Sequence, residues 1–301
     1  MENRSITALM SAFARAYHFK TEKHPVFADS AAEKLMTEEE YAGIAKYVRD
    51  GIDFFAPELA GKLSDSEALG YIVNTQLAPT PLARAAFCEE NLKTAEMTGT
   101  EQYVIIGAGY DTFALRENTF VSEHTVFEID HPLTQADKLE RIKRPGLSYS
   151  ENVKFVPVDL SSEDMSEKLL AAGFDRTKKS FFSWLGVSYY LPEEKIGRTL
   201  QSIAKLCSEG SSLVFDFGDE GLFESEDRRI KNMLAMAAAA GEPMKSSFDM
   251  LTLSRLLEKH GFLIYELLRP KDIEERYFGG RDMIKPFPHI ELALAVYKSQ
   301  R

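Results

Sequence analysis

The feature that most constrains the fold is a pair of apolar runs, one followed by a glycine motif and the other by an acid. The first run, residues 103–106, has the character of a β-strand and stops at Gly107-Ala108-Gly109. The second, residues 125–129, is followed by Asp130. Glycines let the backbone approach a ligand closely, and an acid about twenty residues later receives ribose hydroxyls in nucleotide-type sites. This layout predicts a cofactor that lies across the carboxyl ends of parallel strands.

The glycine motif favours a cofactor that has a ribose but no phosphate. A dinucleotide fold would have a third glycine, for close packing around a pyrophosphate, where this chain has Thr112. Asp111 would also repel a pyrophosphate held by this loop. S-adenosylmethionine meets both conditions and is the cofactor that we expect. A nicotinamide-dependent oxidoreductase would explain Gly107, Gly109 and Asp130, but it would not explain Thr112.

The composition argues against several classes of protein. The chain of 301 residues has a net charge of −11, without the basic stripe of a nucleic-acid-binding surface. No apolar run approaches the roughly 18–20 residues that span a bilayer, and the N-terminus lacks the apolar core of a signal peptide. Two cysteines, Cys88 and Cys207, are too few for a disulfide framework or a zinc site. We therefore expect a cytoplasmic protein with no membrane partner, no nucleic-acid partner and no metal.

The chain divides into two unequal parts. The first has a helical pattern, in which Thr37 and Glu40 form a capping box at the start of one helix. In the second, strands and helices alternate, which is typical of a parallel sheet covered on both faces. We expect a helical cap over residues 1–100 and a cofactor-binding methyltransferase domain over residues 101–301, with an insertion at about 220–248.

The second part contains seven expected strands, at 102–107, 124–129, 153–158, 180–185, 212–217, 262–268 and 289–298. A helix over residues 222–241 would follow the fifth strand as an insertion. The last two strands are separated by a loop rather than a helix, which suggests an antiparallel hairpin at one sheet edge. The expected fold class is α/β, with a seven-stranded, mostly parallel, Rossmann-like sheet, an N-terminal helical cap and an inserted helix. This differs from a six-stranded dinucleotide fold and favours a methyltransferase.

Several segments occur in an order that is typical of one protein family. They are Ala14–Ala16 with His24–Asp29, Pro81–Arg84 with Phe87, Gly107–Thr112 with Leu115 and Arg116, Phe127–Pro132, Val156–Leu160, and Trp184–Leu191. Together they span residues 14–191 and resemble the leucine carboxyl methyltransferase family, including its bacterial branch of O-methyltransferases that act on small molecules and polyketides. The resemblance implies the fold of a class I methyltransferase that depends on S-adenosylmethionine.

The resemblance also implies a set of cofactor-binding residues. Arg84 matches the arginine that grips the cofactor carboxylate, and Asp130 lies at the strand end that binds the ribose. Asp159 and Leu160 match the adenine-binding segment. The complete implied set is Arg84, Gly107, Ala108, Gly109, Asp111, Asp130, Asp159, Leu160 and Leu185. At Leu185 the chain departs from the family, which usually has an acid there, so the cofactor ammonium would rely on backbone carbonyl groups.

The chemistry of methyl transfer bears on the acceptor. Transfer from a sulfonium is a single in-line displacement, so the protein mainly has to hold donor and acceptor aligned in a dry pocket. A carboxylate acceptor is already ionised and needs no base, whereas a phenol or an alcohol would gain from one. The sequence shows no compelling base, which slightly favours an acidic oxygen. The acceptor-side candidates are Tyr189, Tyr190 and His18, although tyrosines in such a place more often pack than react.

The expected function is O-methyl transfer from S-adenosylmethionine to the carboxylate or hydroxyl oxygen of a small organic acceptor. Two alternatives stay open at this point. One is an NAD-dependent Rossmann oxidoreductase, and the other is a catalytically silent protein that binds S-adenosylmethionine. The silent protein would keep the cofactor residues but lack an acceptor pocket, and Leu185 is the residue that keeps this alternative open. The sequence indicates neither the identity of the acceptor nor an oligomeric state.

Overall fold

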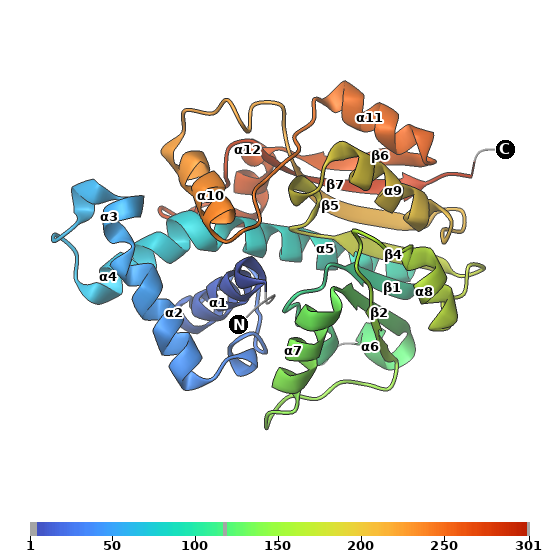
Figure 1. Ribbon diagram of the computed structural model, residues 1–301, viewed down its shortest axis with the longest axis horizontal. Helices are drawn as coiled ribbons and strands as arrows, with labels where there is room; N and C mark the ends of the chain where they lie inside the picture. Colours follow the sequence, from blue (N-terminus) through green and yellow to red (C-terminus); the bar gives the residue numbers. More distant parts are fainter. Residues whose placement is uncertain (1–4, 117–118, 300–301) are drawn as a thin grey trace.

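One seven-stranded sheet forms the centre of the computed structural model, which describes residues 5–116 and 119–299 (Figure 1). Its strands are β1 (Thr100–Ile106), β2 (Thr125–Asp130), β3 (Val153–Pro157), β4 (Lys179–Trp184), β5 (Ser212–Gly218), β6 (Phe262–Leu268) and β7 (Ile290–Tyr297). They lie in the order β3-β2-β1-β4-β5-β7-β6. β7 runs antiparallel to both of its neighbours, and the other adjacent pairs are parallel. The expected α/β fold with a mostly parallel seven-stranded sheet is confirmed.

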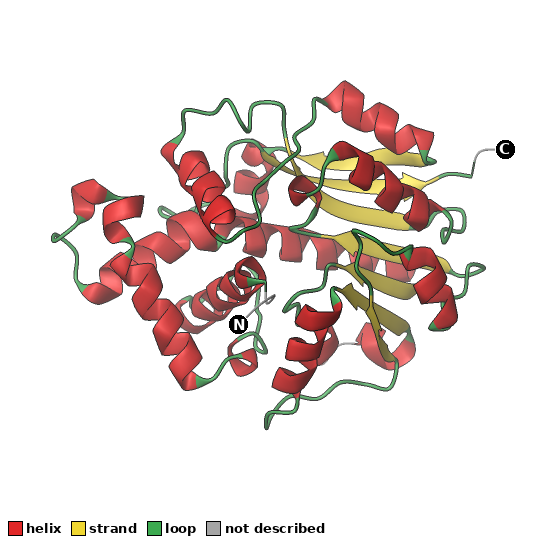
Figure 2. Cartoon of the chain, viewed as in Figure 1, coloured by secondary structure: helices red, strands yellow, loops and turns green. Residues whose placement is uncertain are grey.

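Helices cover both faces of this sheet (Figure 2). They are α5 (Pro79–Met97), α6 (Thr119–Glu123), α7 (Pro132–Ile142), α8 (Met165–Ala171), α9 (Glu193–Ala204) and α11 (Met250–Lys259). Successive strand residues point to opposite faces. In β1, Val104 and Ile106 therefore join the core under α8, α9 and α11, while Tyr103 and Ile105 join the core under α5 and α6. Burial on both faces explains why the central strands β1, β4 and β5 are nearly continuous apolar runs in the sequence.

The N-terminal helices form a separate group beside the sheet (Figure 1). They are α1 (Ile6–Thr21), α2 (Glu38–Asp50), α3 (Ile52–Phe55) and α4 (Asp65–Ile72), followed by a π-helical turn at Val73–Leu77. The expected capping box of α2 is confirmed, since Thr37 and Glu40 each accept the backbone N–H of the other. α5 contacts both groups, with Leu82 in the N-terminal core and Phe87 in the core under the sheet. The division into a cap at residues 1–100 and a domain at 101–301 stays a prediction.

The inserted helix after β5 is present but shorter than expected. α10 spans Arg228–Ala239, whereas the sequence pattern predicted a helix over residues 222–241. Asp227 explains the later start, because its carboxylate accepts the backbone N–H groups of Arg229 and Ile230 and so caps the helix there. In the described part of the chain, no helix is both long and apolar enough to cross a membrane.

The connection between β6 and β7 also differs from expectation. It was predicted to be a plain loop, but it contains α12 (Pro270–Ile273) and a π-helical turn at Glu274–Phe278. Asp272 helps to start this segment by accepting the backbone N–H of Arg269 at 2.9 Å. Ile273 and Phe278 are then buried in the core on the α5 side of the sheet, which stabilises the helical turns. The antiparallel pairing at this edge of the sheet is as expected.

Candidate functional site

A cavity of about 850 Å³ lies at the carboxyl ends of the central strands. This volume is within the range that small-molecule and cofactor sites occupy. All of the expected cofactor residues line it, namely Arg84, Gly107, Ala108, Gly109, Asp111, Asp130, Asp159, Leu160 and Leu185. Tyr189 and Tyr190 line it as well, whereas His18 does not. The fold therefore brings together residues from α5 and from the ends of β1, β2, β3 and β4.

The glycine motif after β1 requires glycine at its first position. Gly107 has a φ angle of +68°, which residues with a side chain rarely adopt. A Cβ atom there would also lie 2.5 Å from a methyl carbon of Val187. The loop is tied to β2, because the N–H of Ala108 donates to the carbonyl oxygen of Ile129 at 2.9 Å. The backbone can thus approach a ligand at the end of β1 without an intervening side chain.

Thr112, which replaces the third glycine of the dinucleotide motif, connects this loop to the N-terminal part of the chain. Its hydroxyl donates to the buried carboxylate of Asp29 at 2.7 Å, and Asp29 forms an ion pair with Arg15 of α1 at 2.8 Å. Burial would raise the pKa of Asp29, but Arg15, Arg116 and Thr112 together lower it. A glycine at position 112 could not make this connection. Arg15 and Arg116 also line the cavity and were not expected from the sequence.

The acids of the site have different environments. Asp130 is held at the end of β2, where its two carboxylate oxygens accept the N–H groups of Gly109 and His131, and burial raises its pKa. Asp111 accepts the N–H of Phe113 at 2.7 Å and so stabilises the turn after the motif. The carboxylate of Asp159 accepts hydrogen bonds from its own loop, which lower its pKa.

The guanidinium of Arg84 has a partner that the sequence did not suggest. Its Nη1 lies 3.2 Å from a carboxylate oxygen of Asp216, a fully buried residue of β5. Nη1 also donates to the hydroxyl of Tyr189 at 3.1 Å, and Nη2 donates to that of Ser11 at 3.4 Å. Burial acts to lower the pKa of Arg84, but Tyr189 and Asp216 outweigh it and raise the pKa. An acid inside the apolar strand 212–217 was the signal that could have identified Asp216, because a buried carboxylate is costly without a partner.

Two segments that are distant in the sequence both line the cavity. One is the first turn of α1, with Ser5, Ile6 and Thr7, and the other is the segment 240–245 after α10. The hydroxyl of Thr7 donates to the carboxylate of Glu242. The first turn of α1 also lies close to the glycine loop, since a Cβ atom at Gly109 would be 3.0 Å from Cβ of Ala8.

The model of the leucine carboxyl methyltransferase family matches residues 8–204. The chain belongs to this family. It is 42% identical over 299 residues to YktD of Bacillus subtilis (strain 168), with 98% of each chain covered, and YktD is provisionally named as a methyltransferase dependent on S-adenosyl-L-methionine. A protein of Mycobacterium sp. (strain JLS) with the same provisional name is 35% identical over 205 residues, covering 66% of this chain and 65% of that protein.

Solved structures show the same fold. A DUF574 family protein from Streptomyces avermitilis MA-4680 has a TM-score of 0.57 at 13% identity, covering 96% of this chain and 97% of the other. A protein from Thermobifida fusca YX, provisionally named a methyltransferase, has a TM-score of 0.51 at 12% identity, covering 99% and 96%. With the family match, the chain is a methyltransferase that uses S-adenosylmethionine, and the NAD-dependent alternative is not favoured.

The three acceptor-side candidates, Tyr189, Tyr190 and His18, differ in their protonation and in their position relative to the cavity. Burial raises the pKa of Tyr189 well above 10, and it raises the pKa of Tyr190 to about 12. Neither tyrosine is therefore a ready base near neutral pH. His18 lies outside the cavity, where its Nε2 accepts the N–H of Val26 at 2.9 Å, and burial lowers its pKa to about 4. The structure thus separates His18 from the two tyrosines.

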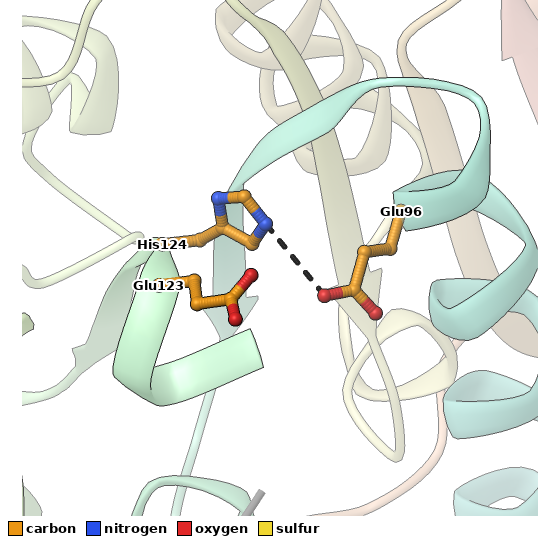
Figure 3. A group of neighbouring side chains, drawn as sticks. All are labelled: Glu96, Glu123 and His124. Atoms are coloured by element: carbon orange, nitrogen blue, oxygen red, sulfur yellow. Dashed lines mark ion pairs between the residues drawn. The ribbon is translucent and has the colours of Figure 1, made fainter. Parts of the chain in front are cut away.

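One group of side chains in the described residues has the spacing of metal ligands (Figure 3). Glu96, Glu123 and His124 lie near the C-terminal end of α5 and the start of β2, and none of them lines the cavity. The ring of His124 lies 3.6 Å from a carboxylate oxygen of Glu96, which accounts for the approach of these two residues. The group is separate from the methyltransferase site, and metal-independent chemistry stays a prediction.

Proposed function

We propose that this methyltransferase transfers a methyl group to an oxygen of a small organic acceptor, preferentially a carboxylate. The observation that carries the proposal is the extent of the cavity. Besides the cofactor residues, its lining includes Tyr190, the first turn of α1 and the segment 240–245. A silent cofactor-binding protein would have no need for lining residues in addition to those that hold the cofactor. The helices of residues 1–100 would then act as a cap over the acceptor.

The lining residues fit S-adenosylmethionine. When bound, this cofactor supplies an electrophilic methyl group. The glycine loop would lie against it, Asp130 would accept its ribose hydroxyls, and Asp159 and Leu160 would hold the adenine. Arg84 would donate to its carboxylate, since an arginine binds carboxylates through charge-assisted hydrogen bonds. Leu185 contributes no charge to this arrangement, so nearby backbone carbonyl groups would receive the ammonium.

The preference for a carboxylate follows from the protonation of the cavity wall. The hydroxyls of Tyr189 and Tyr190 keep their protons near neutral pH because of burial. The hydroxyl of Tyr189 donates its proton to Asp216, so Tyr190 is the one of the two that can donate a hydrogen bond to an anionic acceptor. Neither hydroxyl readily removes a proton from an alcohol. A carboxylic acid, with an ordinary pKa near 4, is already ionised at neutral pH and needs no base. The chain would then contribute alignment of the acceptor and exclusion of water.

A comparison of matched acceptors tests this proposal. The protein is incubated with labelled S-adenosylmethionine and sets of small molecules that share a skeleton but carry a carboxylate, a hydroxyl or an amine. Mass spectrometry detects the gain of one methyl group. We expect methyl esters to form first. Methylation of amines alone would overturn the proposed oxygen acceptor, and alcohols reacting faster than carboxylates would overturn the preference.

A further inference from the structure

The carboxylate of Asp216 contacts three residues that line the proposed donor site, namely Arg84, Gly186 and Tyr189. The residue lies in β5 and is fully buried, and it does not line the cavity itself. One of its oxygens accepts the backbone N–H of Gly186 at 2.6 Å. The other lies 3.2 Å from Nη1 of Arg84 and accepts the hydroxyl of Tyr189 at 3.3 Å. One buried carboxylate thus connects β5 to α5 and to the turn after β4.

The guanidinium of Arg84 also fits closely against Gly186. A Cβ atom at Gly186 would lie 2.6 Å from Cζ of Arg84, so any side chain at this position would displace the guanidinium. Gly186 has a φ angle of +72°, and its N–H is held by Asp216. The carboxylate therefore fixes both the arginine and the turn on which the arginine rests. Leu185, the residue before Gly186, is apolar and supplies no charge for this purpose.

We propose that Asp216 is the positioning residue of the donor site, holding Arg84 and the turn at Gly186 in the arrangement that receives the amino-acid end of S-adenosylmethionine. This inference rests on the proposed role of Arg84 in binding the donor carboxylate. The physical reason is that a buried guanidinium is costly without an anionic partner, so without Asp216 the side chain of Arg84 would shift toward another acid. Asp111 and Glu242 are two other acids that line the cavity. Asp216 keeps Arg84 in place before the ligand arrives, which lowers the ordering cost of binding.

The proposal distinguishes between two ligands that share an adenosine. S-adenosylhomocysteine has the amino-acid end, whereas 5′-methylthioadenosine lacks both the carboxylate and the ammonium. If Asp216 positions the donor site, its substitution should lower the affinity for S-adenosylhomocysteine and leave the affinity for 5′-methylthioadenosine unchanged. A general loss of packing around β5 would lower both affinities alike.

Calorimetric titration of the full-length protein with both ligands provides the test. We expect Asp216→Asn, which keeps the size of the side chain but removes its charge, to weaken S-adenosylhomocysteine by about tenfold to a hundredfold, as for one charge-assisted hydrogen bond. Its affinity for 5′-methylthioadenosine should stay that of the wild type. Glu291→Gln is the matched control, because Glu291 is a buried acid of the adjacent strand β7 and lies outside the cavity. It should change neither affinity.

Other results of the titrations would contradict either the positioning role of Asp216 or the proposed role of Arg84. Equal losses for both ligands, or an unchanged affinity of Asp216→Asn for S-adenosylhomocysteine, would overturn the positioning role. If Asp216→Asn does not fold, Asp216→Glu keeps the charge but displaces the guanidinium, and it should show the same selective loss; wild-type affinity in that variant would overturn the proposal. Failure of the proposed role of Arg84 is distinguishable, because Arg84→Lys would then bind S-adenosylhomocysteine like the wild type.

Discussion

Thr7 and Glu242 are hydrogen-bonded to each other although 235 residues separate them in the sequence. Thr7 lies in the first turn of α1, and Glu242 follows α10, so the contact joins the N-terminal helices to the insertion after β5. Ser5 contributes a second, longer contact to the same carboxylate at 3.5 Å. Both segments line the cavity, and we assign them to the acceptor. If the acceptor binds at these segments, the N-terminal helices and the insertion after β5 both help to enclose it.

We expect Glu242→Ala to weaken the use of the acceptor while leaving the donor site intact. Loss of one hydrogen bond across the cavity wall should raise the KM for the acceptor by about two- to tenfold. The affinity for S-adenosylhomocysteine should be unchanged, because Glu242 contacts none of the proposed donor residues. Steady-state kinetics together with calorimetry measure both quantities. A loss of S-adenosylhomocysteine affinity would assign Glu242 to the donor site instead.

The ligand preference of the folded protein can be measured by thermal unfolding. S-adenosylhomocysteine should raise the Tm, and at a concentration of about 100 times Kd the expected stabilisation is roughly 2.7 kcal/mol. NAD should leave the Tm unchanged, because Asp111 lines the cavity at the loop where a pyrophosphate would lie. Stabilisation by NAD without stabilisation by S-adenosylhomocysteine would contradict the assigned donor site.

The substitution Arg84→Lys tests the proposed role of Arg84 in donor binding. It should disturb the fold less than a substitution that removes the positive charge. Lysine keeps a positive charge near Asp216 but cannot reproduce the planar set of donors. We expect S-adenosylhomocysteine to bind more weakly by about 1.5–3 kcal/mol, the range for hydrogen bonds to charged groups. The complete truncation Arg84→Ala should cost roughly 2–5 kcal/mol of binding free energy. It should also lower the stability of the free protein, since Asp216 would remain buried without its cation.

The strands and the glycine loop could be predicted because their signals are local. Apolar runs that end at glycines or acids define β1 and β2, and alternation with helices then indicates a parallel sheet. Boundaries set by capping were harder to predict. Asp227 starts α10 several residues later than the apolar pattern suggested, because its carboxylate accepts N–H groups that have no acceptor within the helix.

The partner of Arg84 could not be predicted from local patterns. Asp216 lies 132 residues later, and the pair forms only because α5 crosses the sheet near the end of β5. The surroundings of His18 could not be predicted either. It is buried, its ring accepts the N–H of Val26, and it lies outside the cavity lining, while its role at the acceptor stays a prediction. Both contacts depend on tertiary packing that the sequence pattern does not contain.

Gly107→Ala should lower both the stability and the affinity for the donor. The positive φ angle alone costs about 1–3 kcal/mol for a residue with a side chain, and the added methyl group would collide with Val187. Gly43→Ala is the matched control, because a Cβ there meets nothing within 4 Å. Chemical unfolding and titration with S-adenosylhomocysteine measure the two effects. Equal stability of the two variants would contradict the conformation assigned to the loop.

The stability of the protein should contain a pH-dependent contribution from His18. Burial lowers the pKa of His18 from 6.5 to about 4 in the folded state. Between these values the unfolded chain binds a proton that the folded chain does not, so stability rises with pH across this window. His18 therefore contributes its full stabilisation above pH 6.5 and loses it as the pH falls toward 4. Measurement of the free energy of unfolding at several pH values, for the wild type and for His18→Gln, isolates the contribution. The difference between the two proteins should shrink as the pH falls from 6.5 to 4, and a constant difference would show that folding does not change the pKa of His18.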